Sequence, residues 1–403
     1  MKKKIILNIL MSIFFCFALQ AETLFINQIN LMESVSGDLN NDSITSLEIN
    51  ASGITPDQWS ALGNNFINVK ALHITKMFSV KEMCKNFKNL IELKLYNSRL
   101  CLKEVEEIVA NLKGLKHLQL QRCGINDAAA ELIAIELNNL EYLNLSNIPL
   151  KKYDFQYFSN ENAITIEGIT AISLYSKNLK HFNISACVAE DPFILVIAEN
   201  LKNLESLDIS SSIINNNDLI ELANNLKNLK SLNISANDAN GETIKSIGNL
   251  KNLESLILTA NNITDEGIQE ITNNHKNLNI LSISNNPISK IENIENLNNL
   301  EYLDISSTNL DNEALNKLLE NLHNLKYLDV QHCRKISNDF FDNNNIKRIF
   351  DLFNKFETLI YTNYDGCDVN RYSLTRAQKD KNDFGFVKRC IGDFDVFELP
   401  EIL

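Results

Sequence analysis

The side chains that most often perform chemistry are few in this chain of 403 residues, and they are not spaced for it. The six histidines lie at positions 73, 117, 181, 275, 323 and 332, and no pair has the His-x-x-x-His spacing of a helical metal site. The eight cysteines form no Cys-x-x-Cys pair. The sequence has no glycine-rich phosphate loop and no nucleophile elbow. These observations predict a protein that is not an enzyme and that uses no metal and no cofactor.

The composition of the chain argues against two kinds of binding partner. The formal net charge is −13 at pH 7, whereas nucleic acids and anionic membranes both select a basic surface. We therefore expect neither as a partner. Hydrophobic residues make up 44% of the chain, which is enough for a continuous core, and five Pro and twelve Gly are too few for a linker-rich protein.

One phrase of sequence recurs and predicts the elements that must carry any site. In Leu204–Asn228, Leu207 and Ile209 continue a period-two pattern that is typical of a short strand. A helical stripe follows at i, i+3, i+4 and i+7, formed by Leu219, Leu222, Ala223 and Leu226. Asp218 stands directly before this stripe and is predicted as the N-cap. One strand and one helix cannot bury their apolar faces alone, so the copies must stack.

The phrase begins twelve times at regular intervals. Its first residues are Ile44, Val69, Leu90, Leu115, Leu140, Leu179, Leu204, Leu229, Leu253, Leu278, Leu300 and Leu325. Seven of the eleven intervals are 25 residues long, so the sequence predicts a chain of similar coils. The repeats that begin at Val69 and Leu278 are shorter, and we expect less than a full helix in each.

Two copies match the pattern L-x-x-L-x-L-x-x-N/C-x-L with Ile in place of the last Leu. They are LESLILTANNI (Leu253–Ile263) and LKHLQLQRCGI (Leu115–Ile125). Through these residues the chain resembles the leucine-rich-repeat family, and its period is most similar to the ribonuclease-inhibitor-like subfamily and to bacterial members from species that live inside host cells. The resemblance implies an α/β solenoid shaped like a horseshoe, with a parallel sheet on the concave face and helices on the convex face.

Four segments are expected. Residues 1–21 have the form of a secretory signal, because Lys2–Lys4 precede the apolar run Ile5–Leu19 and Ala21 precedes the expected cleavage site. Residues 22–43 are an N-terminal cap, 44–358 are about twelve leucine-rich repeats, and 359–403 are a C-terminal cap. We therefore expect an exported protein, periplasmic, on the cell surface or secreted, with no membrane span after cleavage.

Further strands are predicted outside the regular repeats. LFINQINL (Leu24–Leu31) is predicted as a capping strand, and FETLIYTNY (Phe356–Tyr364) as a degenerate thirteenth strand. In the C-terminal cap, Cys367 and Cys390 could form a disulfide in an oxidising compartment, or both could stay reduced. Their spacing does not decide between these two states.

One turn position in each repeat holds a small polar or thiol side chain. Its occupants are Asn237, Asn261, Asn286, Cys123, Cys187, Cys333, Ser212 and Thr308. An amide at such a position can bond backbone groups of the turn, and a hydroxyl or thiol can partly replace it. We therefore predict that these residues, including the three cysteines, are buried and structural.

Strand positions between the core leucines point toward the concave face and predict the binding surface. Its N-terminal patch is Tyr96, His117, Gln119, Arg122, Tyr142 and His181. Its C-terminal patch is Tyr302, Asp304, Tyr327 and Asp329. Between them a neutral floor of short hydroxyls is expected at Ser185, Ser210, Ser235, Thr259, Ser284 and Ser306. Aromatic and Arg residues contribute most of the energy in protein interfaces, so the two patches are the predicted sites.

An insertion near Pro149–Glu161 carries four aromatic residues on a predicted rim loop. These residues are Tyr153, Phe155, Tyr157 and Phe158. They could form a binding ridge, or they could fold onto the solenoid as a local plug. The sequence supports both interpretations equally.

Taken together, these features predict an exported, monomeric recognition protein whose concave face binds a protein partner. The sequence does not identify that partner, and the bacterial resemblance makes a host protein one candidate. Two alternatives remain open. The first is a structural component of the envelope or cell surface, and the second is a glycan-binding module, because Tyr, His, Asn and Asp side chains suit sugars.

Overall fold

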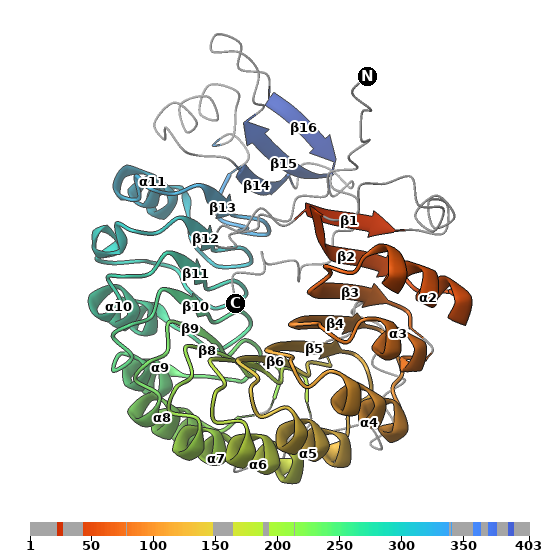
Figure 1. Cartoon of the computed structure of the whole chain (residues 1–403). Coiled ribbons are helices and arrows are strands. Elements are labelled where there is room, and N and C mark those ends of the chain that lie inside the picture. Colours follow the sequence, from red (N-terminus) through yellow and green to blue (C-terminus); the bar gives the residue numbers. More distant parts are fainter. Residues whose placement is uncertain are drawn as a thin grey trace.

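The computed structural model describes residues 22–26, 43–77, 79–147, 164–187, 193–212, 214–337, 340, 358–363, 370–376 and 386–390. Strands line the inner side of an arc, and helices form its outer side (Figure 1). The chain is thus an α/β leucine-rich-repeat solenoid, as the sequence predicts, with its sheet on the concave face.

The strands form one sheet in chain order, each paired with the next. Their bounds are β1 Glu22–Ile26, β2 Ile44–Asn50, β3 Ala71–Thr75, β4 Glu92–Tyr96, β5 His117–Gln121, β6 Tyr142–Asn144, β7 His181–Asn183, β8 Ser206–Asp208, β9 Ser231–Asn233, β10 Ser255–Ile257, β11 Ile280–Ser282, β12 Tyr302–Asp304, β13 Tyr327–Asp329, β14 Thr358–Asn363, β15 Asn370–Arg376 and β16 Phe386–Cys390. All pairings from β1 to β14 are parallel, which confirms the predicted strand within Phe356–Tyr364. The predicted parallel sheet of the repeats is therefore confirmed, and beyond the repeats β15 and β16 extend it with antiparallel pairing.

The helices cover the convex side. Their bounds are α2 Pro56–Asn65, α3 Lys81–Asn86, α4 Leu102–Asn111, α5 Asp127–Glu136, α6 Ile166–Tyr175, α7 Phe193–Asn200, α8 Asn216–Asn225, α9 Gly241–Ile247, α10 Asp265–Asn274, the 3₁₀ helix η4 Ile294–Leu297 and α11 Asn312–Asn321. The two short repeats contain α3, with six residues, and η4, with four, so the expectation of incomplete helices is confirmed.

The predicted N-cap of α8 is wrong by three residues. The cap is Asn215, whose Oδ1 accepts a hydrogen bond from the Asp218 backbone N at 2.9 Å. Asp218 is instead inside the first turn, and its carboxylate accepts from Asn215 Nδ2 at 2.8 Å. Both residue types are good caps, and the apolar stripe starts one turn after the helix does, so the stripe alone misplaces the boundary.

A continuous core runs between sheet and helices. The central inward residue of each strand from β2 to β13 is at most 2% exposed, in the series Leu47, Leu72, Leu93, Leu118, Leu143, Phe182, Leu207, Leu232, Leu256, Leu281, Leu303 and Leu328. Trp59 on α2 is 4% exposed and packs edge-on against Phe87, with ring centroids 6.2 Å apart. Because each coil buries its leucines against the next, the stacked repeats share one core.

The turn residues form a buried ladder that links the coils, as predicted. Asn261 Nδ2 donates to the carbonyls of Ile234 and Leu258, at 3.1 and 3.0 Å. Its Oδ1 accepts from the backbone N of Asn237 and of Ala239, at 3.1 and 2.9 Å. Cysteines at the same position supply the donor only: the Sγ atoms of Cys123, Cys187 and Cys333 donate to the carbonyls of Leu95, Leu145 and Ile305. Burial raises the pKa of the Cys123 thiol to about 12, so this residue is a poor nucleophile.

Candidate functional site

Parallel register arranges equivalent concave residues into rows across the sheet. The row at the first residue of each short strand, called the first-position row, contains Glu92, His117, Tyr142, His181, Ser206, Ser231, Ser255, Ile280, Tyr302 and Tyr327. The row two residues further on, called the third-position row, contains Lys94, Gln119, Asn144, Asn183, Asp208, Asn233, Ile257, Ser282, Asp304 and Asp329. Residues far apart in sequence thereby become neighbours.

Three residues of the predicted N-terminal patch lie side by side in the first-position row. The His117 and Tyr142 rings are 6.0 Å apart between centroids, and the Tyr142 and His181 rings are 5.9 Å apart. Tyr96 and Arg122 are not part of this group, because they lie at the opposite ends of the strands. The predicted patch is therefore divided between the two ends of the strands.

Sequence reasoning missed Glu92, which lies between two histidines of this face. Its carboxylate is 2.5 Å from His73 Nε2, 3.2 Å from His117 Nδ1 and 3.6 Å from Lys94 Nζ. Burial alone would raise the pKa of Glu92, but the hydrogen bonds from His117 and His73 and the charge of Lys94 outweigh it and lower the pKa. The signal in the sequence was the equivalence of Glu92 with His117, one repeat later.

The C-terminal patch contains a stacked pair of tyrosines. The rings of Tyr302 and Tyr327 are 4.3 Å apart between centroids and only 7° from parallel. Burial raises the pKa of both phenols, and the neighbouring Asp304 and Asp329 act in the same direction. Both rings therefore stay neutral and offer a flat amphipathic surface.

The aspartates of this patch have a structural role that the sequence interpretation did not include. Asp304 Oδ1 accepts from the Ser306 backbone N and Asp329 Oδ1 from the Gln331 backbone N, both at 2.9 Å. These bonds close the turn at the end of the strand. Asp329 is 9% exposed and Gln119 only 4%, because adjacent strands crowd this row of the concave face. Third-position residues therefore contribute less accessible surface than predicted.

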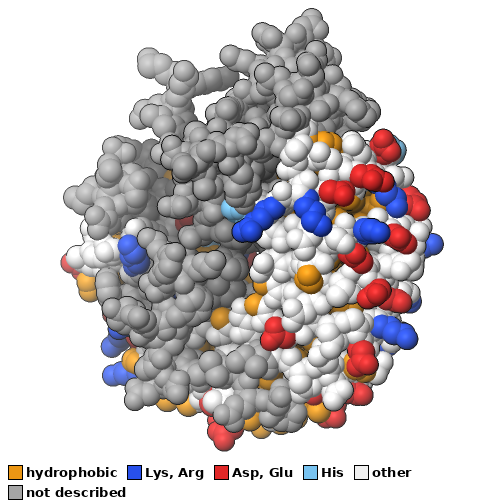
Figure 2. Space-filling view, turned by 180° about the vertical axis from the view of Figure 1, so that it is seen from behind, with side chains coloured by type: hydrophobic (Ala, Val, Ile, Leu, Met, Phe, Trp, Pro, Cys, Tyr) orange, Lys and Arg blue, Asp and Glu red, His pale blue; other side chains and the backbone are white. Residues whose placement is uncertain are grey.

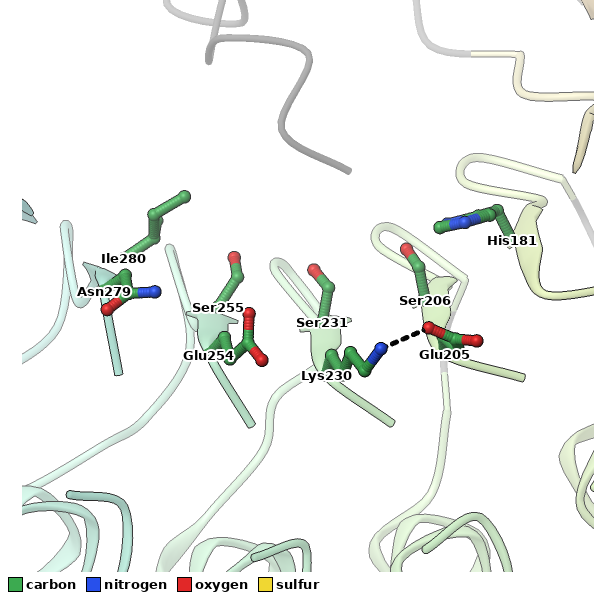
Figure 3. Close-up of a pocket in the computed structure, with 9 residues that line it drawn as sticks. All are labelled: His181, Glu205, Ser206, Lys230, Ser231, Glu254, Ser255, Asn279 and Ile280. Carbon is green, nitrogen blue, oxygen red and sulfur yellow. Dashed lines mark hydrogen bonds and ion pairs between the residues drawn. The ribbon is translucent and has the colours of Figure 1, made fainter. Parts of the chain in front are cut away.

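A hollow lies in the middle of the first-position row, and none of the hydroxyl residues expected as the neutral floor lines it. This central hollow has a volume of about 220 Å³ and is lined by His181, Glu205, Ser206, Lys230, Ser231, Glu254, Ser255, Asn279 and Ile280. The three serine side chains point to the same side of the sheet, between His181 at one end and Ile280 at the other (Figure 3). The hollow exists because the first-position row changes from large rings to serine and back to tyrosine.

A ladder of alternating charge runs beside this row, on the residue directly before each strand from β5 to β13. This strand-start ladder reads Lys116, Glu141, Lys180, Glu205, Lys230, Glu254, Asn279, Glu301 and Lys326. Glu141 accepts from Lys180 at 2.8 Å and from Lys116 at 2.9 Å, and these two bonds lower its pKa to about 2. Elsewhere on the described surface, acidic and basic side chains are also interspersed (Figure 2).

Some predicted residues lie outside the described part of the chain. These are the rim aromatics Tyr153, Phe155, Tyr157 and Phe158, together with Cys367. Cys390 ends strand β16, but its side chain is not described. Within the described residues, no three His, Cys, Asp or Glu side chains are grouped to hold a metal ion. Of the helices described, none combines the length and the apolar character needed to cross a membrane.

Among the comparisons with known proteins, only the one with solved structures found matches. No protein-family model matches the sequence, and the search of curated proteins finds no match. Among solved structures, the chain is similar to Rad7 in a complex of yeast Rad7 and Elc1, with a TM-score of 0.53, 16% identity, and coverage of 83% of this chain and 78% of that one. It is also similar to an internalin, InlF, from Listeria monocytogenes, with a TM-score of 0.44, 20% identity, and coverage of 78% and 90%. The class that the fold defines is the leucine-rich-repeat solenoid.

Proposed function

We propose that this chain is an exported, monomeric recognition protein without enzymatic activity, and that its concave face binds a protein partner. The observation that carries the proposal is the first-position row, where the rings of Tyr142 and His181 and the stacked Tyr302 and Tyr327 stand on either side of the central hollow. Large aromatic side chains around a recess are typical of interface centres. The yeast complex of Rad7 with Elc1, in which a protein of this fold has a protein partner, supports the proposal.

The two ends of the solenoid are proposed as caps. Of the proposed N-terminal cap, residues 22–43, the described strand β1 pairs with β2 at the start of the proposed repeats 44–358. Of the proposed C-terminal cap, residues 359–403, the described strands β15 and β16 extend the sheet at the other end. Terminal units of a solenoid must cover apolar surface that no further coil would bury.

Site-specific cross-linking tests which face binds. A photoreactive amino acid in place of Tyr142 should cross-link one discrete protein from extracts of the cell or its surroundings, identified by mass spectrometry. The same amino acid in place of Gln269, on helix α10 of the convex side, is the matched control. Equal cross-linking from both positions would contradict docking on the concave face.

Alanine substitutions should then divide the binding energy unevenly. Tyr96→Ala, Arg122→Ala and Tyr142→Ala should each weaken binding of the cross-linked partner by about 1–3 kcal/mol, because aromatic and guanidinium groups gain most from desolvation. Ser210→Ala should cost less than about 0.5 kcal/mol. Arg122 has φ 55°, and Ala236 and Ala260 occupy the equivalent turn position at φ 54° and 55°, so Arg122→Ala leaves the turn intact. Isothermal titration measures each affinity, and equal effects of the Tyr and Ser changes would place the partner elsewhere.

Export is proposed from the sequence of residues 1–21, which lie outside the described structure. Replacing Lys2–Lys4 with Glu should retain the protein in the cytoplasm, because a basic segment orients a secretory signal. Mass spectrometry of exported wild-type protein should find Glu22 as the first residue. Exported, soluble protein that still begins with Met1 would refute cleavage.

A further inference from the structure

We propose that the central hollow binds the charged end of an Arg or Lys side chain, which a protein partner projects into the concave face. The inference rests on the proposed function and names the chemistry of the group recognised. It starts from the strand-start ladder, where acidic and basic residues alternate from Lys116 to Glu254. The next position would continue the alternation with a cation, but it holds the neutral Asn279. A cation is missing from the ladder at the hollow.

The charges that line the hollow leave one carboxylate available. Lys230 Nζ is 2.6 Å from Glu205 Oε2, so these two charges neutralise each other. The carboxylate of Glu254 makes no ion pair within 4 Å and no hydrogen bond to any residue that the structure describes. The three charged lining groups therefore sum to −1, which disfavours an anion and attracts a cation.

The floor of the hollow supplies further acceptors. Ser231 and Ser255 are 6% and 5% exposed, and their Oγ atoms find no hydrogen-bond partner among the described residues. A buried hydroxyl without a partner is costly, and an N–H group of a ligand would remove that cost. Guanidinium carries five donors in a plane and ammonium carries three, so either can bond a carboxylate and a hydroxyl together.

The walls suit a basic side chain as well. Burial lowers the pKa of His181 below its ordinary value of 6.5, so the ring is neutral at pH 7 and does not repel a cation. Its Nδ1 also lacks a partner among the described residues. Ile280 at the other end offers an apolar surface for the methylene stem. A volume of about 220 Å³ is below the roughly 300–1,000 Å³ of pockets for drug-sized molecules and fits one side chain.

Peptide titration tests the inference without the natural partner. The probe is the pentapeptide Gly-Gly-Arg-Gly-Gly with both ends blocked, and its match is the same peptide with citrulline, the uncharged isostere of Arg. Titrated into the isotope-labelled full chain and followed by NMR, the Arg peptide should shift the amide signals of Ser231, Glu254 and Ser255. The citrulline peptide should bind at least about 10-fold more weakly, as expected for loss of a charged hydrogen bond.

Two variants and one control locate the interaction. Glu254→Gln should weaken the Arg peptide about 10-fold, and Asn279→Lys should abolish its binding, because the new ammonium completes the ladder. Lys occupies equivalent ladder positions at 116, 180, 230 and 326, so Asn279→Lys is compatible with the fold. Glu301→Gln removes the same charge from a carboxylate already paired with Lys326 at 2.6 Å, and it should change the affinity less than about 2-fold.

Several results would overturn the inference. Equal binding of the Arg and citrulline peptides would do so, as would an Asn279→Lys protein that binds the Arg peptide like wild type. Shifts caused by a neutral trisaccharide but not by the Arg peptide would replace it with glycan recognition. The proposed function is tested separately from the hollow. A protein that is cross-linked from position 142 in both wild type and Asn279→Lys would support docking on the concave face, but it would reject the hollow as the anchor.

Discussion

Asn261→Ala should lower the free energy of unfolding by about 3–5 kcal/mol, although it removes neither a charge nor a large apolar group. Asn261 is 5% exposed, and its amide bonds five backbone groups of two neighbouring coils, the longest bond being the one of 3.4 Å to the Thr259 carbonyl. Alanine would leave the N–H groups of Asn237 and Ala239 and the carbonyl of Ile234 without this partner in a buried turn. The carbonyl of Leu258 would keep its second bond, from Asn286 Nδ2. Each buried polar group left unsatisfied costs about 1–3 kcal/mol, and partial relaxation keeps the total below the sum.

Two further substitutions show whether the ladder causes the loss. Asn261→Cys should destabilise less, because a thiol can donate to a carbonyl as Cys123 does, although it does not replace the Oδ1 acceptor. Asn262→Ala, at the exposed neighbouring residue, should change stability by less than about 0.5 kcal/mol. Urea unfolding measures all three, and hydrogen exchange should show faster exchange at the amides of Asn237 and Ala239. A loss for Asn261→Ala within about 1 kcal/mol of that for Asn262→Ala would refute a stabilising ladder.

His275 should make the protein sensitive to acid. The side chain is 1% exposed, and burial lowers its pKa from 6.5 to about 4, with the charge of Lys251 acting in the same direction. Above pH 6.5 the ring is neutral whether the chain is folded or not. Between pH 6.5 and 4 the unfolded chain binds a proton that the folded chain does not, so stability falls as the pH falls. The loss levels off below pH 4 at about 3 kcal/mol, since one pKa unit corresponds to about 1.4 kcal/mol.

The other repeats indicate which substitution of His275 can test this pH dependence of stability. His275 is the C-cap residue of α10, a place that Leu112, Leu137, Leu226 and Leu322 take on other helices. His275→Leu should therefore be tolerated, and its stability advantage over wild type should grow by about 3 kcal/mol between pH 7 and pH 4. Other titrating groups cancel in this difference. A stability difference between His275→Leu and wild type that stays constant between pH 7 and pH 4 would refute the assignment.

The sequence alone determined the features that can be recognised within a single repeat. Alternation of leucines predicted the strands, the shortened intervals at Val69 and Leu278 predicted the incomplete helices, and the turn residues predicted a buried ladder. Each of these features repeats about every 25 residues, so many copies support the same interpretation. The N-cap of α8 was misplaced because the apolar stripe starts one turn after the helix does, and the antiparallel strands β15 and β16 lie outside the repeats, where no pattern predicted them.

Only the tertiary structure decided which side chains meet across coils. It put Glu92 between His73 and His117, separated Tyr96 from Tyr142, and made Asp304 and Asp329 acceptors for their own turns. It also turned a run of small first-position residues into a hollow beside Glu254, whose carboxylate has no ion-pair partner among the described residues. These relations depend on the register between strands and on the crowding of the concave face. Both are properties of neighbouring coils in contact, and the pattern within a single repeat does not contain them.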